Sequence, residues 1–143
     1  GSYGVLAILF ITLIKWNAII TLATGKPYEI AILSIICAHS LSRFSIIVIP
    51  YFSIPASDEG LARYAGEPET RGVIGGFLLT SFLIFLLLPF DQAILSAVLA
   101  ILVAGVVGLL ANFQIKGYTG DILGAAQQVS EATVLVYLAS SSS

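Results

Sequence analysis

Apolar residues fall in five long runs separated by short polar segments, and this pattern predicts five helices that each cross a membrane. A bilayer-spanning helix needs about 20 mostly apolar residues. The runs that approach or reach this length cover residues 5–24, 30–50, 72–90, 92–111 and 122–139. The last run is the weakest, because it is short and contains Gln127, Gln128 and Glu131. The pattern therefore indicates an all-α, polytopic integral membrane helical bundle.

Helix-breaking residues separate the runs. Gly25, Lys26 and Pro27 end the first run, since glycine and proline stop a helix and a cation suits its C-terminus. Residues 89–91 predict a tight turn before the fourth run. In that fourth run, small residues recur every four positions, which favours close helix packing: Ala100, Ala104 and Gly108. The long connection, residues 55–71, carries six of the fourteen charged side chains: Asp58, Glu59, Arg63, Glu67, Glu69 and Arg71.

Composition excludes several classes of protein. Of the 143 residues, 58% are hydrophobic and 10% are charged, and the mean hydropathy is +1.03. Soluble domains carry about 25% charged residues, so a soluble monomer is excluded, and disorder requires low hydrophobicity. A net charge of −2 without a basic cluster gives nucleic acid nothing to bind. One cysteine, Cys37, and one histidine, His39, exclude a disulfide framework and a Cys- or His-rich zinc site.

Lysine and arginine in short loops indicate how a membrane protein is oriented. The first and third loops lie on one side and hold Lys26, whereas the second and fourth hold Arg63, Arg71 and Lys116. This bias places residues 55–71 in the cytoplasm, with the first helix beginning inside and the last ending outside. Because the chain has no methionine and no signal-peptide pattern, we expect it to begin partway through a longer protein, as a single transmembrane domain over residues 1–143.

Four ionisable side chains lie within the predicted spans or at their edges, where insertion costs a few kcal/mol each. They are Lys15, Arg43, Asp121 and Glu131. Either these charges neutralise one another as structural pairs, or they mark a functional site. Both interpretations stay open for Lys15 and Glu131. For Arg43 the second is favoured, because a planar guanidinium is the usual partner of phosphate.

Helical spacing groups these residues further. His39 and Arg43 are four residues apart and share one face of the second predicted helix. We expect His39 to be a hydrogen-bonded interior histidine rather than a catalytic base. Spacings of three, four and three place one polar stripe on the last helix: Asp121, Gly124, Gln128 and Glu131.

The segment before the last helix, residues 116–121, reads Lys-Gly-Tyr-Thr-Gly-Asp. Two glycines near a helix start expose backbone N–H groups that bind an anion, and Lys116 would add a positive charge. Ordinary capping of the helix by Thr119 or Asp121 is the alternative. In the long loop, Asp58 and Glu59 could bind Mg²⁺, although such acidic pairs are more often simply solvated.

Residues 117–125, Gly-Tyr-Thr-Gly-Asp-Ile-Leu-Gly-Ala, together with Glu131, resemble the C-terminal signature of the cobalamin synthase family, the adenosylcobinamide-GDP ribazoletransferases. Thinner matches occur in the same order at residues 1–4 with Lys15, at Ser42-Arg43 and at Gly60-Leu61. The family's aspartate-rich motif, which precedes the first of these segments, is absent from the 143 residues. The chain therefore resembles the C-terminal portion of such an enzyme.

The resemblance implies a transferase of cobalamin biosynthesis in the prokaryotic inner membrane, with its site facing the cytoplasm. Members join adenosylcobinamide-GDP to α-ribazole, or to its 5′-phosphate, and release GMP, with Mg²⁺ as cofactor. The residues implied in catalysis are Asp121, Glu131 and Lys15, with Asp121 also on the metal. Those implied in binding substrate phosphate are Arg43, Lys116, Thr119 and Gly120. Membrane lipid would surround the protein, and a homo-oligomer stays open.

Two other classes of function stay open beside the transferase. A small transporter or channel subunit would use Lys15, Arg43 and Glu131 to line a polar path, although no inverted repeat is visible. In a non-catalytic assembly subunit, the same charges would be structural pairs. An aspartate-rich motif upstream of Gly1 would distinguish the transferase from both.

Overall fold

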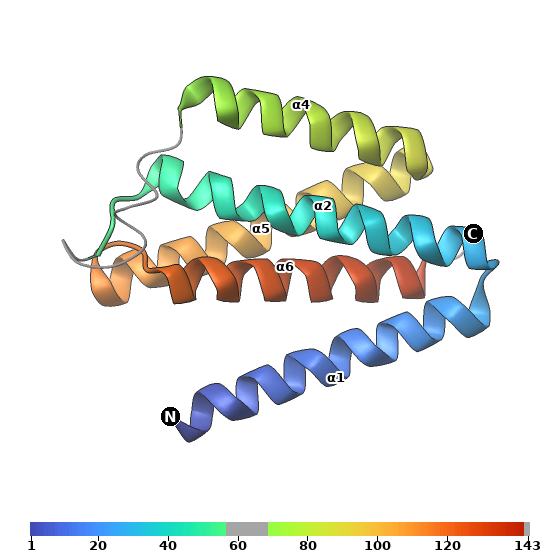
Figure 1. The fold of residues 1–143 in the computed structure, drawn as a ribbon, viewed down its shortest axis with the longest axis horizontal. Helices are drawn as coiled ribbons and strands as arrows, with labels where there is room; N and C mark the ends of the chain where they lie inside the picture. The colour runs from blue at the N-terminus through green and yellow to red at the C-terminus, as the bar shows by residue number, and fades with distance from the viewer. Residues whose placement is uncertain (57–68, 142–143) are drawn as a thin grey trace.

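A computed structural model describes residues 1–56 and 69–141, and this part of the chain is built from five long helices (Figure 1). They are α1 (Ser2–Gly25), α2 (Tyr28–Phe52), α4 (Thr70–Leu87), α5 (Phe90–Ile115) and α6 (Gly120–Ser140). Each is long and apolar enough to cross a membrane. The predicted all-α bundle with five spans is confirmed.

Prolines lie at two of the boundaries between helices. α4 ends at Leu87 instead of residue 90, because Pro89 disfavours helical geometry at the residue before it and has no N–H to donate. Phe90 instead begins α5, with Pro89 at its N-cap, so the turn predicted at residues 89–91 is shorter than expected. Gly25 ends α1 and Pro27 precedes α2, as predicted.

α6 is the central helix of the bundle. It packs against α1, α2 and α5, while α4 packs mainly on α2 (Figure 1). Much of the core is made of small side chains, such as Ala38 and Ala93, which let helix backbones approach closely. Ala100 and Ala104 are both buried, so the packing role predicted for the small residues of the fourth run is confirmed.

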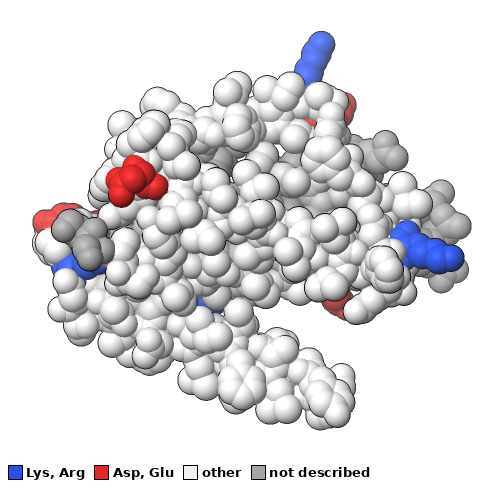
Figure 2. Space-filling model, turned by 180° about the vertical axis from the view of Figure 1, so that it is seen from behind, with Lys and Arg blue, Asp and Glu red and all other residues white. Residues whose placement is uncertain are grey.

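The outer surface is apolar between two charged ends. Large hydrophobic side chains of α1, α4 and α5 are exposed, among them Phe10, Phe82 and Leu109. Figure 2 shows one face on which lysine, arginine and acidic side chains gather mainly near the ends, with a broad uncharged band between them. A band of this kind is what the hydrocarbon core of a bilayer covers.

The ends of the helices alternate between the two ends of the bundle, as five consecutive spans require. Figure 1 shows the start of α1, the end of α2, the start of α4 and the α5–α6 turn at one end of the bundle. The α1–α2 and α4–α5 turns and the end of α6 lie at the other end. In the long connection, residues 57–68 lie outside the described part of the chain, and Thr70 already belongs to α4.

Two backbone hydrogen bonds join the α5–α6 turn to the segment that follows α2. The Tyr118 N–H donates to the Ile54 carbonyl at 3.0 Å, and the Ala56 N–H donates to the Tyr118 carbonyl at 2.9 Å. Gly117 allows this close approach. A Cβ at residue 117 would lie 2.5 Å from the Ile54 carbonyl oxygen and 2.8 Å from the backbone nitrogen of Ala56.

We expect Gly117→Ala to lower the free energy of unfolding in detergent by about 1–3 kcal/mol, because the methyl group meets fixed backbone rather than a movable side chain. Gly105→Ala is the matched control, since a Cβ there meets no atom within 4 Å. It should leave stability unchanged or slightly raised, because alanine is the better helix former. If the two variants were equally stable, the close approach of residue 117 to the Ile54 and Ala56 backbone would not require glycine.

Candidate active site between α1 and α6

An ion pair deep in the bundle joins α1 to α6. Lys15 Nζ lies 2.6 Å from Glu131 Oε1, and the two side chains are only 19% and 4% exposed. Glu131 is about 16 Å from the start of α6 at 1.5 Å per residue, so the pair lies within the membrane-spanning region. Opposite charges attract strongly in a medium of low dielectric constant, and each charge would be costly there without the other. The structure thus supports pairing for Lys15 and Glu131.

Two further polar side chains complete this cluster. His39 Nδ1 on α2 lies 3.3 Å from Glu131 Oε2, and Lys15 Nζ donates to Gln128 Oε1 at 2.8 Å. Both oxygens of the Glu131 carboxylate therefore have a partner, each from a different helix. The expected polar partner of His39 is present, but its side chain is 53% exposed. The expectation of an interior histidine is wrong, because this part of α2 also borders an open groove beside α4.

A cleft of about 790 Å³ lies between the N-terminal halves of α1 and α6. Figure 1 shows α1 diverging from α6 toward its own N-terminus, which leaves this space open. The α1 wall carries no polar side chain and is formed by Gly4, Ala7, Ile8, Phe10, Ile11 and Ile14. The α6 wall carries two polar side chains, Asp121 and Gln128, and its other lining residues are Gly120, Gly124, Ala125 and Val129. Gln128 lines the cleft and accepts a hydrogen bond from Lys15, so the Lys15–Glu131 ion pair lies next to the inner end of the cleft.

The start of α6 lies at the outer end of this cleft. The Thr119 hydroxyl accepts a hydrogen bond from the Ile122 N–H at 3.4 Å, which confirms Thr119 as the N-cap. The N–H groups of Gly120 and Asp121 have no intrahelical acceptor, because they belong to the first turn of the helix. No atom lies within 4 Å of the position of a Cβ on Gly120 or Gly124, so ligand atoms can approach the backbone there. These features suit an anion.

The Asp121 carboxylate adds a negative group to the same end of the cleft. It is exposed and makes no ion pair or hydrogen bond with any residue that the structure describes. A carboxylate beside an anion-binding helix start can hold a cation that a bound phosphate also ligates, or accept a proton from a hydroxyl group. Within residues 1–56 and 69–141, no group of three or more His, Cys, Asp or Glu side chains is arranged to hold a metal ion.

Arg43 lies in a different cavity. It borders a groove of about 440 Å³ between α2 and α4, and His39 borders the same groove, so their predicted shared face is confirmed. Arg43 forms no ion pair in the described part of the chain. The proposal that the interior charges simply neutralise one another therefore holds for Lys15 and Glu131 but does not extend to Arg43 or Asp121.

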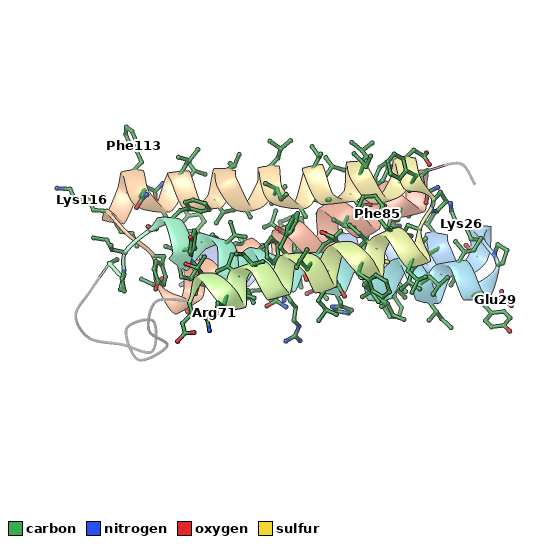
Figure 3. All side chains as sticks on the ribbon, turned by 90° about the horizontal axis from the view of Figure 1, so that it is seen from above. Lys26, Glu29, Arg71, Phe85, Phe113 and Lys116 are labelled. Carbon is green, nitrogen blue, oxygen red and sulfur yellow. The ribbon has the colours of Figure 1, made fainter. Side chains whose placement is uncertain are left out.

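Lys116 lies on the other side of the α5–α6 turn from the cleft. It caps α5 in the left-handed conformation, with φ of 56°, and borders a cavity of about 650 Å³ at the end of the bundle. In Figure 3 its side chain extends away from the helices. Asp58 and Glu59, the predicted acidic pair, lie outside the described residues.

The structure thus brings most of the predicted site residues to one place. Gly120 and Asp121 line the outer part of the cleft, Thr119 caps the helix there, and Lys15 and Glu131 form the ion pair beside its inner end. The prediction of site residues omitted His39 and Gln128, which hold that pair in place. For Gln128 the signal was present, because it belongs to the predicted stripe on α6; His39 required the packing of α2 against α6.

Several known proteins are similar to this chain in sequence. A family model described as cobalamin-5-phosphate synthase matches residues 1–139. The proteins named adenosylcobinamide-GDP ribazoletransferase from Bradyrhizobium diazoefficiens and Shewanella pealeana are 32% identical over 139 residues and 36% identical over 141 residues. A relative of the same name from Mesorhizobium japonicum is 35% identical over 136 residues.

The matches cover the chain and the relatives unequally. They span 95–97% of this chain but 51–54% of these three relatives, so the chain spans about half the length of the curated relatives it matches. No solved structure matches the chain significantly.

We expect Glu131→Leu and Lys15→Met each to lower the free energy of unfolding in detergent by about 3–5 kcal/mol, since either change leaves one buried charge without its counterpart. The double variant should lose much less than the sum of the two losses, because it removes both charges together. Chemical denaturation of the four proteins completes the double-mutant cycle. Additive losses would show that the pair contributes no coupling energy.

Proposed function

The chain belongs to the cobalamin-5-phosphate synthase family, and we propose that it supplies part of the active site of an adenosylcobinamide-GDP ribazoletransferase. The proposed enzyme joins adenosylcobinamide-GDP to α-ribazole or its 5′-phosphate and releases GMP. Because the chain spans about half the length of its relatives, the proposal concerns a longer protein that contains this segment. The aspartate-rich motif of the family would belong to the remainder of that protein.

One observation carries the proposal: the α1–α6 cleft has at one end an open helix start and the Asp121 carboxylate, which pairs with none of the described residues, and beside its other end an ion pair. In the proposed reaction, a ribose hydroxyl attacks the phosphorus attached to cobinamide, and the bond from that phosphorus to the GMP oxygen breaks. Such a reaction depends on neutralising phosphate charge and aligning the two oxygens more than on a protein nucleophile.

The residues of the cleft suit these tasks. The N–H groups of Gly120 and Asp121 would donate to diphosphate oxygens, and the missing Cβ of Gly120 allows that approach. The Asp121 carboxylate would accept the proton of the attacking hydroxyl or help to bind a metal. The Lys15–Glu131 pair would keep α1 at the distance from α6 that admits the substrate. The apolar α1 wall would exclude water from the reacting groups.

Mg²⁺ is part of the proposal as the cofactor. Asp121 fits such an ion as one oxygen ligand, because Mg²⁺ is commonly held by one or two carboxylates together with substrate phosphates. When bound, the metal would supply neutralisation of the diphosphate charge. Further carboxylates would have to come from outside the described residues, because the described residues hold no group of three or more His, Cys, Asp or Glu side chains arranged for a metal ion.

The proposed site lies at the end of the bundle that the loop charges assign to the cytoplasm. The N-terminus, the α5–α6 turn and the outer end of the cleft share this end (Figure 1). Both proposed substrates are large and cytoplasmic, which supports placing the enzyme in the inner membrane with this end inward. The transporter hypothesis gains no support, because Glu131 is buried and held by Lys15 and His39 rather than lining a continuous path.

Asp121→Asn in the full-length enzyme, reconstituted in lipid nanodiscs, should lower kcat/KM for GMP release by about 100-fold or more, because the charge in the cleft is lost. Asp91→Asn is the matched control, since Asp91 occupies the first turn of α5 at the opposite end. It should keep normal turnover. If Asp121→Asn were folded and turned over normally, Asp121 would have no part in the chemistry.

Arg43 stays a predicted phosphate-binding residue, and Arg43→Lys tests this role. Lysine keeps the charge but cannot donate two parallel hydrogen bonds to phosphate, so KM for adenosylcobinamide-GDP should rise by about 10-fold. Arg71→Lys, at the exposed start of α4, should leave KM unchanged. An unchanged KM in Arg43→Lys would count against phosphate binding in the α2–α4 groove.

A further inference from the structure

The end of the bundle holds a second cavity, distinct from the α1–α6 cleft. It has a volume of about 650 Å³ and lies where α2 and α5 end and α4 begins. The lining residues that matter here are Tyr51, Phe52, Ser53, Thr70, Asn112 and Lys116. Residues with aromatic, hydroxyl, amide and ammonium groups thus border one space, whereas the α1 wall of the cleft is apolar.

Two hydrogen-bond donors on this lining remain available for a ligand. Asn112 lies in the last turn of α5 and Lys116 follows the helix as its C-cap, and both residues border the cavity. Asn112 Oδ1 accepts a hydrogen bond from the Ser53 hydroxyl at 2.9 Å, which orients the amide and leaves its NH₂ group to donate elsewhere. The Lys116 ammonium makes no ion pair in the described part of the chain. An ammonium with an adjacent amide donor suits a phosphate group.

The α2 residues of the lining suit a planar aromatic ring. Tyr51 and Phe52 are in edge contact, with ring centroids 5.1 Å apart, and both remain exposed, at 41% and 77%. Exposed aromatic faces stack with heterocyclic bases. The Tyr51 hydroxyl lies 3.5 Å from the Thr70 hydroxyl, and these two groups can exchange hydrogen bonds with a sugar. The cavity therefore matches a ligand with an aromatic base, a sugar and a phosphate.

The α5–α6 turn connects the lining of one cavity to the lining of the other. Lys116 borders the end cavity and Gly120 borders the cleft, so the chain between them spans at most about 14 Å. The backbone bonds of Tyr118 to residues 54 and 56 hold this turn in place. A reaction between two substrates needs two sites that are close together and fixed relative to each other.

We infer that the end cavity binds the phosphorylated aromatic riboside, with Lys116 and Asn112 on its 5′-phosphate and Tyr51 and Phe52 against its base. This inference rests on the proposed function and assigns the second substrate to the end cavity. It makes Lys116 a specificity-determining residue that favours the 5′-phosphate of α-ribazole over the free riboside, while the cleft holds the diphosphate substrate.

The test compares α-ribazole 5′-phosphate with α-ribazole as substrates of the full-length enzyme in lipid nanodiscs. Lys116→Asn removes the charge and keeps a residue that tolerates the left-handed backbone. It should raise KM for the phosphorylated riboside by about 10-fold and leave KM for the free riboside within about two-fold, because only the former carries the phosphate. Lys116→Arg, which keeps the charge, should restore most of the preference.

Arg71→Gln is the matched control. Arg71 lies at the same end of the protein as Lys116 (Figure 3) but does not line the cavity, so its loss should not alter the preference for phosphate. Phe52→Leu should raise KM for both ribosides equally, because the base is common to them. If Lys116→Asn is folded but inactive, equilibrium dialysis measures how tightly it binds α-ribazole 5′-phosphate. Binding at least 10-fold weaker than that of the wild type supports the assignment. Unchanged binding overturns it.

The outcomes separate this inference from the proposed function. Equal effects of Lys116→Asn on both ribosides, or no effect on either, would overturn the assignment while the enzyme still released GMP. A wild-type enzyme that released no GMP with either riboside would contradict the proposed function itself. Equilibrium dialysis with α-ribazole 5′-phosphate would then still test whether the end cavity binds this compound, independently of the reaction.

Discussion

The Lys15–Glu131 ion pair is the interaction on which the arrangement of α1 depends. Most of α1 is exposed, and its apolar side chains gain little by leaving lipid for other apolar side chains. An ion pair in a medium of low dielectric constant holds the helices together more strongly than these apolar contacts, because separating it would leave two uncompensated ions in the membrane. His39 and Gln128 add partners, so the pair fixes the depth of α1 against α6 and its rotation.

A single strong contact partway along two helices has a structural consequence. Near Lys15 the two helices are held together, whereas toward the N-terminus α1 carries Gly4 and Ala7 and diverges from α6 (Figure 1). The cleft is the space left by this divergence. Its apolar and polar walls follow from the sequences of the two helices, and the ion pair that stabilises the bundle also limits how far the cleft extends.

The other end of α6 is fixed by backbone contacts instead of charge. Gly117 and Tyr118 bring the α5–α6 turn against the segment after α2, and this contact positions both the helix start in the cleft and the lysine of the end cavity. The two cavities therefore share one rigid boundary. Two residues only four apart in sequence, Lys116 and Gly120, consequently border separate spaces.

Helices and polar stripes could be predicted from residue order, because hydrophobic length and a period of 3.6 residues are local properties. The five spans, the Thr119 cap and the stripe from Asp121 to Glu131 are of this kind. Which partner a charge meets is a property of packing: Glu131 meets Lys15 and His39, whereas Arg43 borders a separate groove. The placement of Lys116 away from the cleft likewise follows from the turn at Gly117. Local sequence sets which face of a helix is polar, but contacts between distant segments decide what that face meets.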